Sequence, residues 1–285
     1  MIGDAFDSTI NTSLTLHSQY YPSHIGIIAK MGAPAARPTV RLGVFLPAGA
    51  QVLDTACVDV LATMSHEYLS LLEDLVPPPI INLAPSIKIF YIGIVQPGEP
   101  IEMTAAMSIQ CTHHFSDPEV GPGNLDIVLV PGPDPRLSFE RAALDWLAAH
   151  AARKETDILS VCTGIFICGE AGLLKGKKVC GPRSMQTQLK AKFEGSTWFG
   201  DSLRWIQDGN FWSCGGVTNG NDLVSAYARH TPKHFPGPIA EFGVNICDVG
   251  DRPQQYETGQ AMFTLRMVWQ VIKAAVMGVG KRKQT

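Results

Sequence analysis

The fold of this chain is indicated most directly by the stretch DILSVCTGIFICGEAGLL, residues 157–174. An apolar run ends at Val161, and Cys162 occupies the joint that follows. Thr163 and Gly164 then open a segment with helical spacing. A strand, a sharp turn and a helix in this order are typical of a nucleophile elbow, which presents one side chain at the carboxyl end of a parallel sheet. The stretch therefore predicts an α/β fold with a reactive cysteine at a strand end.

On both sides of this stretch, apolar strands alternate with helical segments. We expect buried strands at residues 39–46, 87–94, 125–132 and 156–161. We expect helices at residues 54–75, 138–152, 163–171, 184–193, 219–227 and 258–280. The pair Asp208-Gly209 predicts a tight turn between two strands. Short apolar runs that alternate with helices suit a sheet covered on both faces, so the predicted class is a doubly wound α/β fold with a mostly parallel sheet.

Composition along the chain suggests three parts. Residues 1–38 form an N-terminal extension that is polar at first and ends in GAPAARP. Residues 39–252 form the α/β domain. Residues 253–285 form a C-terminal helical extension with a basic end, KRKQT. Its apolar segment Ala261–Val276 leads us to expect a homodimer.

Charge and motif content exclude several classes of partner. A formal net charge of −3 leaves no general basic surface for nucleic acid. No apolar run approaches the roughly 20 residues of a membrane helix, and the first residues lack a secretory signal pattern. Seven cysteines without a regular framework suit a reducing compartment, so we expect a cytoplasmic protein. Metal-ligand spacing, GxxxxGK and GxGxxG are absent from the sequence, so we expect no metal and no cofactor.

The chemistry expected at Cys162 follows from its place before a helix. The helix dipole favours a negative charge there, so we expect a lowered thiol pKa. The alternative is that Cys162 is a small apolar plug. Gly164 favours a site, because glycine permits the close approach of a backbone or a ligand. The residues also leave two roles open for Asp54, which is either a helix cap or an acid near the cysteine.

Four segments, in consistent order, resemble the ThiJ/PfpI superfamily. They are GVFLPAGAQVLDTACVDVLA (43–62), LDIVLVPGPDP (125–135), LSVCTG with GEAGLLKGKKV (159–179), and FWSCGGVTNGNDLVSAY (211–227). The resemblance covers about residues 40 to 250 and is closest to the branch of isocyanide hydratases and their fungal relatives. It implies a flavodoxin-like domain, similar to class I glutamine amidotransferases, that needs no cofactor and acts on a small molecule.

The resemblance also assigns roles to particular residues. Asp54 matches the acid that hydrogen-bonds the cysteine, and the backbone N–H groups of Gly132 and Thr163 match a site for negative charge on a reacting atom. The catalytic residues implied are Cys162, Asp54 and Thr163, and the substrate-binding residues implied are Gly132, Pro133, Gly164 and Arg183. The role of Arg183 rests on its place next to Pro182, and two roles stay open for it, binding of an anionic group near the pocket or a solvated surface position.

One departure from the superfamily pattern weakens a cysteine–histidine mechanism. Many members carry a histidine where this chain has Pro182, and the sequence does not show which residue replaces it. His113 and His114 are adjacent and point to opposite sides of a strand. We therefore expect an isocyanide hydratase-like reaction in which the Cys162 adduct is hydrolysed and Asp54 moves the proton. Two alternatives stay open, a glyoxalase-like conversion of α-oxoaldehydes and a non-enzymatic redox sensor or chaperone.

Overall fold

A computed structural model describes residues 36–282 of the chain, with side chains to residue 277, so nearly all of the expected extension 1–38 lies outside the described residues. The described part contains a seven-stranded sheet in the order β10-β11-β7-β6-β1-β2-β5. Its strands are β1 (Thr39–Leu46), β2 (Ser86–Gly93), β5 (His113–His114), β6 (Ile127–Val130), β7 (Asp157–Ser160), β10 (Trp205–Asp208) and β11 (Phe211–Cys214). All neighbours run parallel except β10 and β11, which confirms the mostly parallel doubly wound class.

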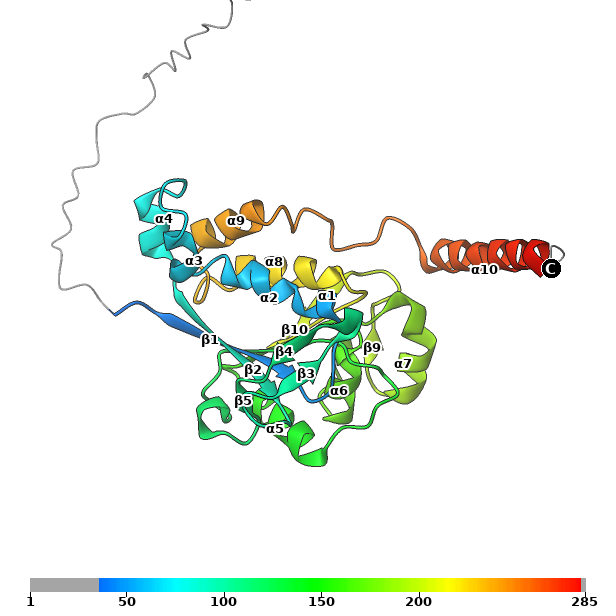
Figure 1. The fold of residues 1–285 in the computed structure, drawn as a ribbon, viewed down its shortest axis with the longest axis horizontal. Coiled ribbons are helices and arrows are strands. Elements are labelled where there is room, and N and C mark those ends of the chain that lie inside the picture. Colours follow the sequence, from blue (N-terminus) through cyan, green and yellow to red (C-terminus); the bar gives the residue numbers. More distant parts are fainter. Residues whose placement is uncertain (1–35, 283–285) are drawn as a thin grey trace, which may run out of the picture. The chain divides into compact units, whose positions relative to one another are not determined.

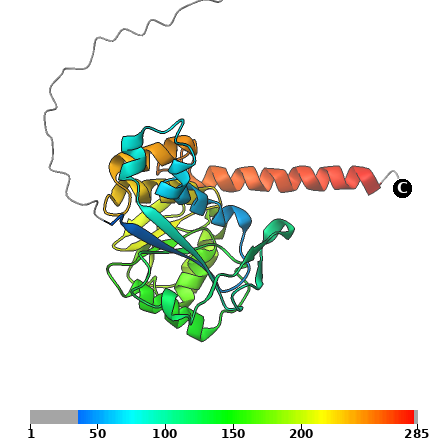
Figure 2. The same ribbon diagram turned by 60° about the vertical axis from the view of Figure 1, so that its left-hand side comes forward.

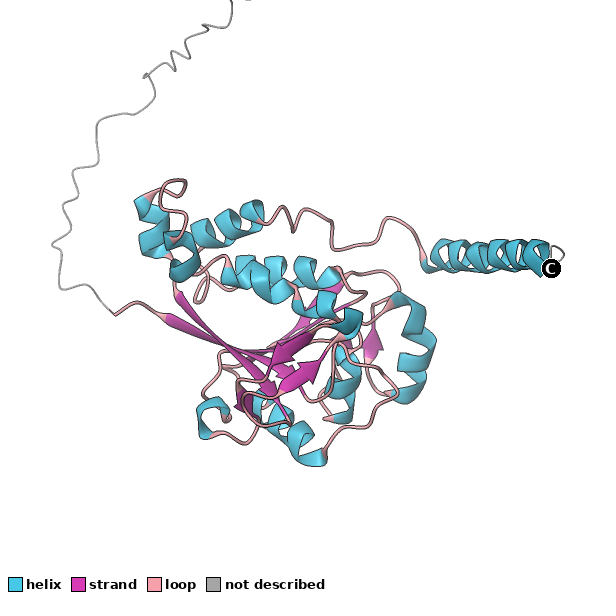
Figure 3. Cartoon of the chain, viewed as in Figure 1, coloured by secondary structure: helices cyan, strands magenta, loops and turns pink. Residues whose placement is uncertain are grey.

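Helices cover both faces of this sheet (Figures 1 and 3). The helices are α1 (Val52–Thr55), α2 (Cys57–Ala62), α3 (His66–Ser70), α4 (Pro78–Leu83), α5 (Arg141–Ala151), α6 (Gly164–Glu170), α7 (Gln186–Lys192), α8 (Asn219–His230), α9 (Gly237–Ile246) and α10 (Gln260–Arg282). The short 3-10 turns are η1 (Thr104–Ala106), η2 (Pro118–Val120) and η3 (Arg183–Met185). Two small sheets pair β3 (Pro100–Glu102) with β4 (Ser108–Gln110), and β8 (Lys178–Val179) with β9 (Thr197–Trp198).

The two-residue period of the strands divides the core into two apolar clusters. On one face of β1, Leu42, Val44 and Leu46 pack in a cluster with residues of α2, α8 and α9. Phe45 points to the opposite face and packs with residues of α5 and α6. Because successive side chains of a strand point to opposite faces, both faces of a central strand must be apolar when helices cover both. This explains why the central strands are continuous apolar runs.

The prediction of one continuous helix at residues 54–75 is wrong. The structure divides it into α1, α2 and α3. The hydroxyl oxygen of Ser65 accepts a hydrogen bond from the N–H of Tyr68 (3.1 Å) and so caps a new helix.

The later elements follow the expected order. Gly209 has a φ of 64° and forms the tight turn of the β10–β11 hairpin. Figure 2 shows α10 as one uninterrupted helix near the C-terminus. Its side chains are largely exposed, including Trp269 at 55% and Val271 at 69%. Among residues 36–282, no helix combines the length and the apolar composition that crossing a bilayer requires.

Candidate active site

Cys162 occupies a strained turn between β7 and α6. Its φ of 55° lies in the left-handed region, which costs a non-glycine residue about 1–2 kcal/mol. The turn is held because Val161 N–H donates to Val130 O (3.0 Å) and Gly164 N–H donates to Val161 O (2.9 Å). A Cβ atom at Gly164 would overlap the Val130 carbonyl oxygen. The glycine is therefore required for the start of α6 to approach β6.

Asp54 reaches the same site from α1, after the end of β1. Because β1, β6 and β7 are neighbours and parallel, their carboxyl ends meet at one edge of the sheet. Two hydrogen bonds join the loops there: Gln51 N–H donates to Gly132 O (2.9 Å), and Gly132 N–H donates to Asp54 Oδ2 (3.0 Å). Asp54 is fully buried and caps no helix, so its carboxyl faces the site rather than a helix end.

The Asp54 carboxyl and the Cys162 thiol form an interacting buried pair. Burial raises the pKa of Asp54 to about 7, although the Gly132 N–H and the Cys162 thiol favour its carboxylate. Burial, and then the negative charge of Asp54, raise the pKa of Cys162 to about 12, although the Thr163 N–H favours the thiolate. The expected lowering of the cysteine pKa is therefore wrong, because the short helix α6 cannot offset burial beside a carboxylate. Near neutral pH the pair holds a thiol and an acid poised between its two protonation states.

One oxygen of this pair has no hydrogen-bond partner among the described residues. Asp54 Oδ2 is bound by Gly132, whereas Oδ1 is buried and unpartnered. A buried carboxylate oxygen without a donor is costly unless it holds a proton or receives one. Because Oδ2 accepts the Gly132 N–H, Oδ1 is the oxygen that holds the proton when Asp54 is in its acid form.

Thr163, Gly132 and Pro133 shape the loop opposite the cysteine. The Thr163 hydroxyl donates to Pro133 O (2.7 Å), which joins the start of α6 to the loop after β6. A Cβ atom at Gly132 would lie 2.5 Å from Asp54 Oδ2 and 2.8 Å from Thr163 N, so only glycine fits. The expected role of the Gly132 N–H in binding a reacting atom is wrong, because Asp54 already accepts its hydrogen bond. The Thr163 N–H instead faces the cysteine sulfur.

A cavity of about 390 Å³ opens onto this pair, and Cys162 contributes to its wall although the residue is only 7% exposed. Its lining comprises Gly49, Ala50, Gln51, Glu102, Met103, Thr104, Gly132, Pro133, Asp134, Pro135, Leu137, Cys162 and Thr163. A small molecule that enters the cavity therefore meets the sulfur directly.

The sequence did not identify one wall of this cavity. Glu102, Met103 and Thr104 come from β3 and the residues after it. Thr104 N–H donates to Ala50 O (3.0 Å), and Val52 N–H donates to Thr104 Oγ1 (3.0 Å), which seats this segment on the loop after β1. No local motif marks these residues, because their role depends on contacts with a segment about 50 positions away.

Two residues expected to bind substrate lie elsewhere. Gly164 is absent from the cavity wall and serves the backbone packing of α6. Arg183 lines a different cavity, where it donates to Thr258 O (2.8 Å) and Gln260 Oε1 (3.2 Å). Thr258 and Gln260 therefore hold this arginine in a cavity whose lining does not include Cys162. Asp134 accepts a hydrogen bond from Arg136 N–H (3.0 Å) in the loop after β6, and it also lines the Cys162 cavity.

Two other titratable side chains, Glu102 and Asp134, line the cavity beside this pair. Among the described residues, no histidine lines the cavity, and Pro182 lies in the cavity of Arg183. All seven cysteines are free, and burial raises the pKa of Cys57 and of Cys214 close to the pair. Within the described residues no three His, Cys, Asp or Glu side chains cluster as metal ligands would.

Comparison with known families identifies the chain. The model of the DJ-1/PfpI family matches residues 61–230, more than half of the sequence and including the cysteine elbow. The chain belongs to the DJ-1/PfpI family. This confirms the resemblance seen in the sequence motifs, and Asp54 lies before the first residue that the family model matches.

Individual proteins share part of their sequence or their fold with this chain. An isonitrile hydratase from Pseudomonas putida is 31% identical over 133 residues, which are 46% of this chain and 54% of that protein. The match thus spans about half the length of that relative. A ThiJ/PfpI family protein from Pseudomonas syringae superposes with a TM-score of 0.59 at 20% identity, covering 88% of this chain and 95% of the other. An AraC family transcriptional regulator from Pseudomonas putida superposes with a TM-score of 0.54 at 16% identity, covering 73% and 99%. These two structures show the shared fold.

Proposed function

We propose that this chain is a cofactor-independent enzyme that uses Cys162 to add water to a small electrophile, with an isocyanide as the favoured substrate class. The observation that carries the proposal is the buried Asp54 carboxyl beside a thiol that faces a cavity. A thiol with a raised pKa needs a base to become a nucleophile, and the adjacent carboxylate supplies one. The partial identity with an isonitrile hydratase supports the same chemistry.

The first step forms a bond between Cys162 Sγ and the terminal carbon of the isocyanide. The Asp54 carboxylate takes the thiol proton as the sulfur attacks and then delivers this proton to the same carbon. The product is a thioimidate, R–N=CH–S–Cys, and no oxidant or reductant is needed. The Thr163 N–H, which faces the sulfur, stabilises the negative charge during the transfer.

The second step hydrolyses the thioimidate. Asp54 takes a proton from a water molecule that adds to the carbon, and it passes this proton to the nitrogen. As the C–S bond of the tetrahedral intermediate breaks, Asp54 moves the hydroxyl proton of the intermediate to Cys162, and an N-substituted formamide leaves. The sum of the two steps is one isocyanide plus one water to one formamide.

The test measures formamide release from a set of small isocyanides by the full chain. We expect turnover by the wild type, none by Cys162→Ala, and wild-type turnover by Cys247→Ala, a matched control for a half-buried cysteine outside the cavity. A mass increase equal to one isocyanide on the Cys162 peptide would mark the thioimidate.

The two alternatives give different results in the same experiment. Lactate from methylglyoxal without formamide from any isocyanide would favour a glyoxalase-like enzyme. Absence of both products, together with reversible oxidation of Cys162, would favour a redox sensor.

A further inference from the structure

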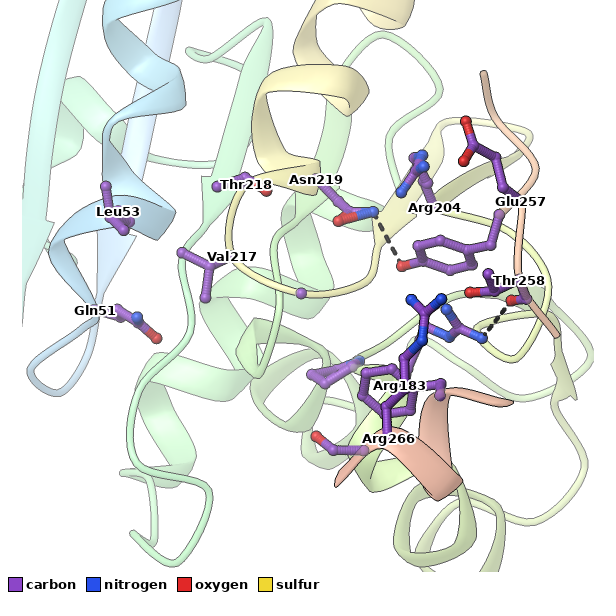
Figure 4. Close-up of a pocket in the computed structure, with 15 residues that line it drawn as sticks. Gln51, Leu53, Arg183, Arg204, Val217, Thr218, Asn219, Glu257, Thr258 and Arg266 are labelled. Carbon is purple, nitrogen blue, oxygen red and sulfur yellow. Dashed lines mark hydrogen bonds between the residues drawn. The ribbon is translucent and has the colours of Figure 1, made fainter. Parts of the chain in front are cut away.

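A second cavity, of about 600 Å³, lies beside the N-terminal end of α8 (Figure 4). Its lining residues differ from those of the Cys162 cavity. Its lining comprises Gln51, Leu53, Pro182, Arg183, Ser184, Arg204, Gly216, Val217, Thr218, Asn219, Tyr256, Glu257, Thr258, Phe263 and Arg266. Only Gln51 is shared by the two linings. Neither Cys162 nor Asp54 lines it.

Three arginines from three different elements converge on this cavity. Arg183 belongs to η3, Arg204 precedes β10, and Arg266 lies on α10. Among the described residues none of the three forms an ion pair with a carboxylate. With Glu257 as the single acidic residue in the lining, three arginines leave a net charge of +2. Such an uncompensated charge in a hollow favours an anion.

A tyrosine ring orders two of these guanidinium groups. The centre of the Tyr256 ring lies 4.2 Å from the Arg183 guanidinium carbon and 4.6 Å from that of Arg204. The Tyr256 hydroxyl in turn accepts a hydrogen bond from Asn219 Nδ2 (3.0 Å) at the start of α8. Contact with an aromatic face restricts the rotamers of arginine, so little of its side-chain entropy remains to be lost when a ligand binds.

Most N–H donors of these arginines are still available. A guanidinium has five N–H donors. Arg183 uses two of them, for Thr258 O and Gln260 Oε1, and Arg204 uses its Nε–H for Pro253 O (3.0 Å). The remaining donors suit the oxygens of a phosphate group, which arginine binds through paired hydrogen bonds.

The opposite side of the cavity is less polar. Figure 4 shows Leu53 and Val217 on the side away from the three arginines. Leu53 is 54% exposed although it is a large apolar side chain. The cavity therefore has a cationic end and an opposite end where Leu53 and Val217 offer apolar surface beside the polar Gln51 and Thr218.

From these observations we propose that this second cavity binds a small phosphate monoester, with the phosphate at Arg183, Arg204 and Arg266 and the organic body against Leu53 and Val217. A phosphate monoester carries close to two negative charges at neutral pH, which matches the net charge of the lining. A cavity of this volume is also large enough for a small organic ligand. The proposal concerns a separate site and does not depend on the reaction proposed for Cys162.

The test is calorimetric titration of the full chain with phenyl phosphate and with inorganic phosphate at constant ionic strength and pH 7.5. We expect saturable binding of both, tighter for phenyl phosphate. Arg266→Gln should weaken the affinity about tenfold or more, the loss expected for one charge-assisted contact. Lys273→Gln, the same charge change two turns along α10 and outside the lining, should leave the affinity unchanged.

Further variants separate ligand binding from tethering of the C-terminal segment. Arg204→Lys keeps the charge and loses the planar donor set, so it should weaken phenyl phosphate binding without unfolding the chain. Cys162→Ala should bind phenyl phosphate as the wild type does, whether or not the proposed hydratase activity is found. Absence of saturable binding would overturn the proposal, as would equal loss in Arg266→Gln and Lys273→Gln, or inorganic phosphate binding as tightly as phenyl phosphate.

Discussion

Replacement of Asp54 by asparagine tests the central pair most directly. An asparagine keeps the size of the side chain, and its oxygen can accept the Gly132 N–H bond, but it cannot carry a proton between sulfur and carbon. General acid–base assistance is worth about 10²–10⁴-fold, so kcat/KM should fall by that factor. In the wild type, kcat/KM should rise through pH about 7 as Asp54 ionises, and this inflection should be absent from the variant.

The stability of this variant follows from the same pKa. The folded chain holds the Asp54 proton more tightly than the unfolded chain, because its pKa is about 7 rather than 3.8. The free energy of unfolding of the wild type therefore falls as pH rises from about 4 to above 7. The fall is about 4 kcal/mol in total, because a difference of one between the folded and unfolded pKa corresponds to about 1.4 kcal/mol. About 3 kcal/mol of this loss occurs between pH 5 and pH 8. Asp54→Asn removes this dependence.

In Asp54→Asn, the buried side-chain amide itself lowers the free energy of unfolding. Its NH₂ group replaces Oδ1, which has no partner among the described residues, and this costs about 1–3 kcal/mol. The variant should therefore be about equal to the wild type or less stable at pH 5, and more stable than the wild type by about 1–3 kcal/mol at pH 8. Denaturant unfolding at both pH values measures this change, and formamide release measures the kinetics. A stability difference that does not vary with pH, or a loss of kcat/KM below tenfold, would refute the role given to Asp54.

Three further predictions concern the thiol, the turn and the assembly. Because the pKa of Cys162 is about 12, its alkylation by iodoacetamide should be slow at pH 7 and should become about tenfold faster per pH unit up to pH 10. Mass spectrometry of the Cys162 peptide measures this rate. Fast labelling at a rate that is constant above pH 6 would show a thiolate instead. Glycine adopts a φ of 55° without strain. The free energy of unfolding of Cys162→Gly should therefore be higher than that of Cys162→Ala by ~0.5–1 kcal/mol, as measured by denaturant titration. The reverse order would contradict the strained turn. The exposed apolar side chains of α10 lead us to expect a homodimer, with a light-scattering mass near twice 30.8 kDa, whereas the mass of one chain at micromolar concentration would contradict it.

The central strands and the elbow could be predicted because their signals are local. Runs of apolar residues bounded by proline and glycine mark buried strands, and the sequence Val161-Cys162-Thr163-Gly164 encodes a strand end, a turn and a helix start. Helix continuity was less predictable between residues 54 and 75, since a single serine cap at Ser65 outweighed an apolar pattern that suited one long helix.

The protonation of the site, in contrast, depends on tertiary contacts. Asp54 and Cys162 are 108 positions apart, and the direction of each pKa shift is set by how completely other segments bury them. The same holds for Arg183, whose side chain is held by Thr258 and Gln260 more than 70 positions away. The sequence alone therefore determined the fold class and the position of Cys162 at a strand end, because backbone geometry and apolar periodicity act over a few neighbouring residues. The tertiary structure decided the charge state of that cysteine and which cavity each side chain faces, because desolvation and hydrogen bonding depend on atoms brought together by folding.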